Sequence, residues 1–254
     1  MTDHDHDFAR AVERLYATFA GYRLEQPIPG CACCVFPEDQ APLVSAPLRA
    51  MSSDALEKFA RKSISTWGGV EDYKHFLPRL LELEARGPAD ATTSVAAKLI
   101  YASWRTWPAA EQGAIAAYYQ SLAASLLSQT APERPLSDVL EDAVTLGIDM
   151  TAFLDAWTRL KGEASAVLQF ARLTGELYSF SLWKVLAVGS RHEGSMVWQQ
   201  LRAWLLDPTN EAVLVDAYLT RKAGSTAFSD EQLREIETAA DHFAMRVYQL
   251  GRAA

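Results

Sequence analysis

Three cysteines lie within four positions of one another, and they are the residues of this sequence best suited to chemistry. Cys31, Cys33 and Cys34 stand in a segment with prolines on both sides, from Gln26 to Pro37, which predicts a rigid loop without helical structure. Cys31 and Cys34 have the C-x-x-C spacing with which two sulfur atoms reach one tetrahedral zinc ion at about 2.3 Å. The loop is therefore a candidate zinc site.

A closed zinc site needs four ligands, and the rest of the sequence has no second C-x-x-C pair and no pair of histidines four to six positions apart. Cys33 and a distant residue such as His75 would have to complete the set. We expect Cys33 and Cys34 to be an awkward pair of ligands, because adjacent side chains diverge along an extended backbone. The candidate metal ligands are thus Cys31, Cys33, Cys34 and His75.

Two other interpretations of the loop are open. A C-x-x-C pair can have one thiol of lowered pKa, most readily at the N-terminus of a helix, and a helix is expected to begin just downstream at Pro37. That arrangement would be a redox-active or reactive pair of thiols. In the remaining interpretation the thiols are small, half-buried side chains that pack the proline-rich loop against helices.

A second candidate group lies further along the chain. Asp72 is expected to cap a helix that begins near Tyr73, which places Asp72 and His75 within one helical turn. Such a pair can be a general base with its orienting carboxylate, although a neutral histidine near a capped helix end is the commoner arrangement. Lys74 and Arg79 make the same stretch locally basic, which suits an acidic partner; a solvated helix face is the alternative.

The sequence around these residues resembles a family of uncharacterised bacterial all-α proteins. The resemblance rests on the proline-flanked C-x-C-C loop, on the segment 66–83 (TWGGVEDYKHFLPRLLEL), and on a W-x-x-W-P-x-x-E pattern that runs from Trp104 to Glu111. It covers about the first half of the chain. It implies a cytoplasmic helical protein and brings no activity with it, because none is established for the family.

The charge balance excludes some classes of partner. The chain of 254 residues has 24 Lys and Arg against 32 Asp and Glu, a formal net charge of −8. Nucleic-acid binding takes most of its affinity from basic residues that neutralise phosphates, and anionic membranes also attract basic segments. The most apolar window, 177–188, is shorter than the roughly 20 residues that span a bilayer. We therefore expect neither a nucleic acid nor a membrane as partner.

Helical periodicity dominates the chain. Apolar residues recur at steps of three and four, for example at Val12, Leu15 and Phe19, and no stretch alternates apolar and polar residues over the length of a strand. The sequence predicts an all-α fold. Helices are expected over 54–66, 73–84, 94–106, 137–146, 151–160, 164–187, 195–206 and 211–222, with others near 8–19, after 108 and after 229.

One helical domain is expected over residues 1–254. A subdivision near 132–135, into 1–131 with the cysteine loop and 136–254, is the alternative. The segments that begin at Pro108 and Pro208 have weakly similar sequences, as expected for the repeats of a HEAT-like α-solenoid. An irregular multi-helix array suits the same pattern.

The chain has seven tryptophans, which suits thick packing between helices. We expect most of them in the core. Trp104 and Trp107, which bracket Arg105, are the pair expected to be exposed. We expect these two residues to contact a partner, together with Arg105, Lys74 and Arg79.

Two functions from different classes follow from these observations. The first is a non-enzymatic helical scaffold that binds another protein. The alternative is a metal- or thiol-dependent protein whose site joins the cysteine loop to Asp72 and His75. The acidic first residues and the odd number of cysteines in one short segment favour the cytoplasm over a secreted, disulfide-linked protein.

Overall fold

The computed structural model describes residues 2–24, 26–87, 94–175, 195–222 and 227–252, and these ranges are mostly helical. They contain no strand, only two isolated bridges that join Trp67 to Gly30 and to Ser63. The all-α prediction is confirmed. The chain divides into two compact units, one over Phe8–Tyr118 and the other over Met1–Asp7 with Tyr119–Ala254.

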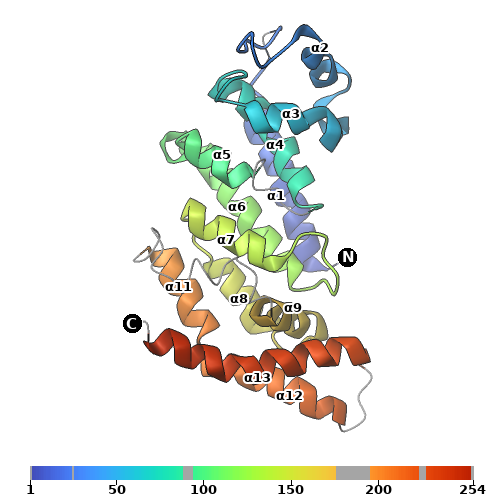
Figure 1. Ribbon diagram of the computed structural model, residues 1–254, viewed down its shortest axis with the longest axis vertical. Helices are drawn as coiled ribbons and strands as arrows, with labels where there is room; N and C mark the ends of the chain where they lie inside the picture. Colours follow the sequence, from blue (N-terminus) through green and yellow to red (C-terminus); the bar gives the residue numbers. More distant parts are fainter. Residues whose placement is uncertain (1, 25, 88–93, 176–194, 223–226, 253–254) are drawn as a thin grey trace. The chain divides into compact units, whose positions relative to one another are not determined.

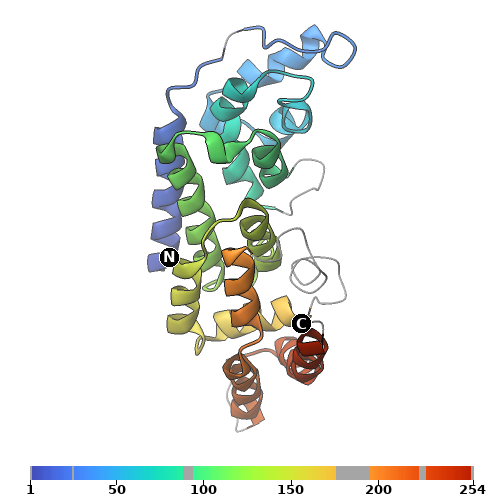
Figure 2. The ribbon, with the colours of Figure 1, turned by 90° about the vertical axis from the view of Figure 1, so that its left-hand side faces the viewer.

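The unit Phe8–Tyr118 holds the cysteine loop, which connects α1 to the short helix α2 (Figure 2). Helix α1 buries Val12, Leu15 and Phe19, the apolar stripe expected from the sequence. The elements of this unit are the part of α1 (Asp3–Phe19) from Phe8 on, α2 (Pro37–Gln40), η1 (Ala41–Val44), η2 (Leu48–Ala50), α3 (Ser53–Lys62), α4 (Val70–Glu84), α5 (Val95–Tyr101), η3 (Trp104–Thr106) and the first half of α6 (Ala109–Leu126).

The second unit continues through α6 and holds an aromatic core. The rings of Trp157 and Trp204 meet edge to face at 5.6 Å, and the Trp157 indole N–H donates to the Asn210 side chain at 3.0 Å. Figure 1 shows α12 and α13 side by side in this unit. Its further elements are α7 (Leu136–Leu146), α8 (Thr151–Leu160), α9 (Ala164–Gly175), α11 (Met196–Leu205), α12 (Pro208–Lys222) and α13 (Asp230–Arg252).

The helix limits follow the sequence closely where the ends are signalled locally. Helix α8 has the expected limits, and α7 begins one residue early. The helix expected over 94–106 is interrupted, because Ser103 takes a left-handed conformation (φ 53°) between α5 and η3. The part of the expected helix 164–187 beyond Gly175 lies outside the described residues.

The division into units falls between Tyr118 and Tyr119, inside α6. The sequence predicts one domain, with an alternative subdivision near 132–135. No helix in the described ranges is both long enough and apolar enough to cross a bilayer. The solenoid stays a prediction.

Candidate metal centre

The three cysteine sulfurs converge on one point at the surface of the unit Phe8–Tyr118. The Sγ atoms of Cys31 and Cys33 lie 2.9 Å apart, and those of Cys33 and Cys34 lie 3.4 Å apart. All three sulfurs are within 4.8 Å of one another. Cys31 and Cys33 are exposed and Cys34 is half-buried, so the cluster is open to solvent.

A turn of the backbone brings the thiols together. The carbonyl of Cys31 accepts hydrogen bonds from the backbone N–H groups of Cys34, at 2.8 Å, and Val35, at 2.9 Å. The expectation that Cys33 and Cys34 diverge is therefore wrong, because it assumed an extended backbone and the chain is folded into a turn at these residues. The expected helix at Pro37 is present as α2.

The segment after α3 holds the first side of this loop. The N–H of Cys31 donates to the Thr66 carbonyl at 2.8 Å, and the N–H of Gly68 donates to the Pro29 carbonyl at 2.7 Å. Trp67 lies between these contacts with 1% of its surface exposed, and its ring packs edge to face on Phe59 at 5.4 Å. Two backbone hydrogen bonds and a buried indole thus fix the entry to the turn.

Helix α2 holds the other side. The Gln40 side chain accepts from the N–H of Ile28 at 3.2 Å and donates to its carbonyl at 2.9 Å. The Asp39 carboxylate accepts from the N–H of Phe36 at 2.7 Å and forms an ion pair with Lys58 of α3. The cysteine turn is therefore held at both ends before any ion binds.

Hydrogen bonds among the thiols favour ionisation of Cys31 over that of Cys33. The Lys62 ammonium group donates a hydrogen bond to the Cys34 carbonyl at 2.7 Å, which places a positive charge at the backbone of the turn. A hydrogen bond from the Cys33 thiol lowers the pKa of Cys31. The same contact, with Cys31 as the favoured thiolate, raises the pKa of Cys33 to about 11.

Thiol geometry suits a thiophilic ion. Two sulfurs bound to one tetrahedral zinc ion at 2.3 Å lie about 3.8 Å apart, which the two pairs that involve Cys33 reach by opening less than about 1 Å each. Side-chain rotation is enough for such a shift, since all three thiols have solvent beside them.

The structure does not bring His75 into this cluster. In the described part of the chain, the group of potential ligands consists of the three cysteines. The His75 Nδ1 atom lies 2.7 Å from the Tyr22 carbonyl oxygen, so this nitrogen has a hydrogen-bond partner elsewhere. Asp72 accepts from the N–H of Gly69 at 2.7 Å, and α4 begins at Val70 rather than near Tyr73. Asp72 thus serves the start of its own helix.

The expectation that Trp104 and Trp107 are exposed is wrong. Trp104 has 1% and Trp107 6% of its surface exposed, and the Trp107 indole donates to the Ala102 carbonyl at 3.1 Å. Arg105 alone of the three is exposed, and its guanidinium lies 4.3 Å from the centre of the Trp104 ring. The turn at Ser103 separates α5 from η3 and directs both indoles inward.

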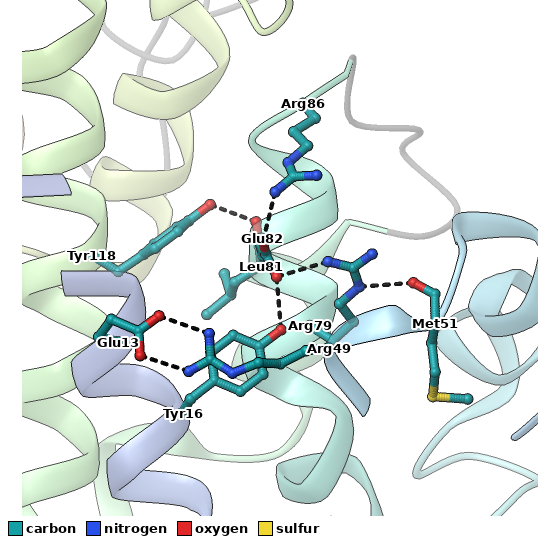
Figure 3. A network of polar contacts seen from close by, with 9 residues as sticks. All are labelled: Glu13, Tyr16, Arg49, Met51, Arg79, Leu81, Glu82, Arg86 and Tyr118. Carbon is teal, nitrogen blue, oxygen red and sulfur yellow. Dashed lines mark hydrogen bonds and ion pairs between the residues drawn. The ribbon is translucent and has the colours of Figure 1, made fainter. Parts of the chain in front are cut away.

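Lys74 and Arg79 are also buried rather than on a solvated face, and both meet acids of the same unit. Lys74 forms an ion pair with Glu111 at 2.9 Å. Arg79 donates to Glu82 at 2.8 Å and to the Met51 carbonyl at 2.7 Å (Figure 3). The positive charges of Lys74 and Arg79 are therefore paired with acids in the interior of the unit. An acidic partner at the surface would not contact them.

Lys62 is the residue of the site that the sequence did not reveal. It lies at the end of α3, 28 positions after Cys34, and its ammonium group meets the Cys34 carbonyl only in the folded unit. No local pattern signals such a contact.

The fold and site define an all-α protein with a solvent-facing turn of three thiols. No protein-family model, no curated protein and no solved structure matches the chain.

Proposed function

We propose that the protein binds a thiophilic metal ion, such as zinc, through Cys31, Cys33 and Cys34. The observation that carries the proposal is the convergence of the three sulfurs within 4.8 Å on a turn held at both ends. A turn that is already ordered does not have to lose much conformational entropy when the ion binds.

The ligand count favours an open site. Structural zinc sites are closed by four protein ligands, whereas sites with three protein ligands keep a position for water or another molecule. Three thiolates around a divalent ion leave one net negative charge. The Lys62 ammonium group beside Cys34 opposes that charge and supports the proposal.

Metal analysis of protein purified without chelator and without an affinity tag tests the proposal. We expect about one zinc ion per chain for the wild type and a large loss in the variants Cys31→Ser, Cys33→Ser and Cys34→Ser. Ala32→Ser is the matched control, since it adds a hydroxyl to the same exposed turn and removes no thiol. Less than about one-tenth of a zinc ion per chain would contradict the proposal.

Cobalt substitution gives an independent readout. Co²⁺ bound by thiolates has a sulfur-to-metal charge-transfer band, which is absent when oxygen ligands alone bind the ion. We expect the band in the wild type and in Ala32→Ser. A cysteine variant that kept the full band would contradict the role of that cysteine.

A reducing compartment suits this function, because metal binding needs thiolates and thiols persist where disulfides are reduced. We therefore propose a cytoplasmic location. The protein-binding scaffold stays a prediction. Of the residues expected to contact the partner, Trp104, Trp107, Lys74 and Arg79 are buried, and Arg105 is exposed. Affinity capture that recovers a stoichiometric partner would support it.

A further inference from the structure

The three-thiol turn is complete for an ion that needs three ligands. The described part of the chain places no fourth carboxylate, imidazole or thiol in this group, so a tetrahedral ion would depend on water or a second molecule. Trivalent arsenic and antimony differ in this respect. Each forms three bonds in a pyramid whose apex holds a lone pair, so three thiolates satisfy the ion fully.

The separations between the sulfurs point in the same direction. With bonds of about 2.3 Å, a tetrahedral ion sets two sulfurs about 3.8 Å apart, and a pyramid with nearly right angles sets them about 3.3 Å apart. The two separations that involve Cys33 are 2.9 and 3.4 Å. In the pairs Cys31–Cys33 and Cys33–Cys34, the sulfur separations are therefore closer to those of the pyramidal ion than to those of the tetrahedral ion.

Exposure of the thiols allows the neutral hydroxide of the ion to reach them. Cys31 and Cys33 are exposed, and the half-buried Cys34 lies 3.4 Å from Cys33. The trihydroxide is neutral, and so is the complex of the trivalent ion with three thiolates. Binding therefore needs no charged side chain to balance the complex.

We propose that the turn formed by Cys31, Cys33 and Cys34 is a binding site for trivalent arsenic or antimony, supplied as the neutral trihydroxide. This inference rests on the proposed function, because it assigns the ion class of the same three thiols. The reaction is a ligand exchange without oxidation: As(OH)₃ and three thiols give As(S–Cys)₃ and three molecules of water. Each As–O bond is replaced by an As–S bond, and each thiol proton leaves in water.

Arsenite is the probe, and the protein is the reduced chain of 254 residues. Intact-protein mass spectrometry should show the gain of one arsenic atom and the loss of three hydrogen atoms, with all three thiols lost to titration. X-ray absorption should show three sulfur neighbours and no oxygen neighbour at the arsenic atom.

The serine variants give the sharper measurement. Each of Cys31→Ser, Cys33→Ser and Cys34→Ser should keep one hydroxyl on the arsenic and bind it at least about tenfold more weakly, because one tethered ligand is lost. Ala32→Ser should match the wild type. The thiols are on the surface, and circular dichroism of each variant confirms that the helices are retained.

The outcomes separate this inference from the proposed function. An adduct that retains a hydroxyl in the wild type, or no adduct at all, overturns the arsenic site. If zinc binds in the same preparation, the proposed function survives that result. If neither zinc nor arsenite binds, both proposals are overturned.

Discussion

The Lys74 ammonium nitrogen lies 2.9 Å from a carboxylate oxygen of Glu111, and both side chains are more than nine-tenths buried. The Tyr22 hydroxyl also donates to Glu111, and the Trp107 ring centre lies 4.5 Å from the ammonium group. The 66–83 segment and the Trp104–Glu111 pattern, which carry the resemblance noted in the sequence, meet at this pair. These motif residues thus hold the fold of the unit.

Replacing Glu111 should destabilise the protein strongly. Glu111→Gln leaves the buried Lys74 charge without its partner, which typically costs about 3–5 kcal/mol. Denaturation by urea, followed by tryptophan fluorescence, measures the change. Glu71→Gln is the matched control, since Glu71 is 75% exposed and lies 3.9 Å from the same ammonium group, so its loss should cost less than about 1 kcal/mol. Equal effects of the two substitutions would contradict the role assigned to the buried pair.

Glu82 should make the unit sensitive to acid. Burial acts to raise the pKa of Glu82, but hydrogen bonds from Tyr16 and Arg79 outweigh it and hold this pKa below its ordinary value of 4.5 (Figure 3). A carboxyl group with a lowered folded pKa contributes stability above the unfolded value and loses it as the pH falls through the folded one. Glu82→Gln should therefore be less stable than the wild type at neutral pH and should show a shallower loss of stability in acid. Parallel acid titrations of the two proteins would contradict this.

Glu141 should have the opposite effect in the other unit. Burial and the neighbouring Asp138 carboxylate raise the pKa of Glu141. Ionisation of a group with a raised folded pKa costs stability at higher pH, and this cost disappears as the pH falls below the unfolded value. Glu141→Gln should raise the melting temperature at neutral pH and leave it nearly unchanged in acid. A melting temperature lowered at neutral pH would contradict the prediction.

Gly68 should be required for the shape of the cysteine loop. Its φ is +67°, and an added Cβ would lie 2.8 Å from an Asp72 carboxylate oxygen. Gly68→Ala should cost roughly 1–3 kcal/mol and weaken zinc binding, because the Gly68 N–H holds Pro29 at the entry to the turn. The control is Gly69→Ala, whose Cβ would lie 3.9 Å from the same oxygen, with φ −110°. If the two alanine variants had the same stability and zinc affinity, the assignment would be wrong.

Lys62 should support the ion without binding it. Lys62→Gln removes the positive charge beside the Cys34 carbonyl, so we expect zinc affinity to fall by about tenfold, the lower range for groups behind the ligands. Arg61→Gln is the control, because Arg61 is exposed and pairs with Glu57 in the same helix. Competition with a chromophoric chelator measures both. Unchanged affinity in Lys62→Gln would show that this charge has no part in the site.

Most helices could be predicted from the amino-acid sequence. The limits of α8 and nearly those of α7 follow from apolar periodicity and from local end signals, because helical hydrogen bonds join residues four positions apart. The same reasoning failed at Ser103, where one left-handed residue ends α5 and turns Trp104 inward. The spacing of apolar residues does not indicate the backbone conformation of a single residue such as Ser103.

The geometry of the candidate site depends on contacts between distant parts of the chain. The sequence marked Cys31, Cys33 and Cys34 as candidate ligands, but the turn that gathers their sulfurs is held by Thr66 and Gly68, from another part of the chain. Contacts between segments distant in sequence likewise buried Lys74 against Glu111, where the spacing of charges alone suggested a solvated face. Such contacts depend on how the helices pack, and packing is set by the whole unit rather than by any window of residues.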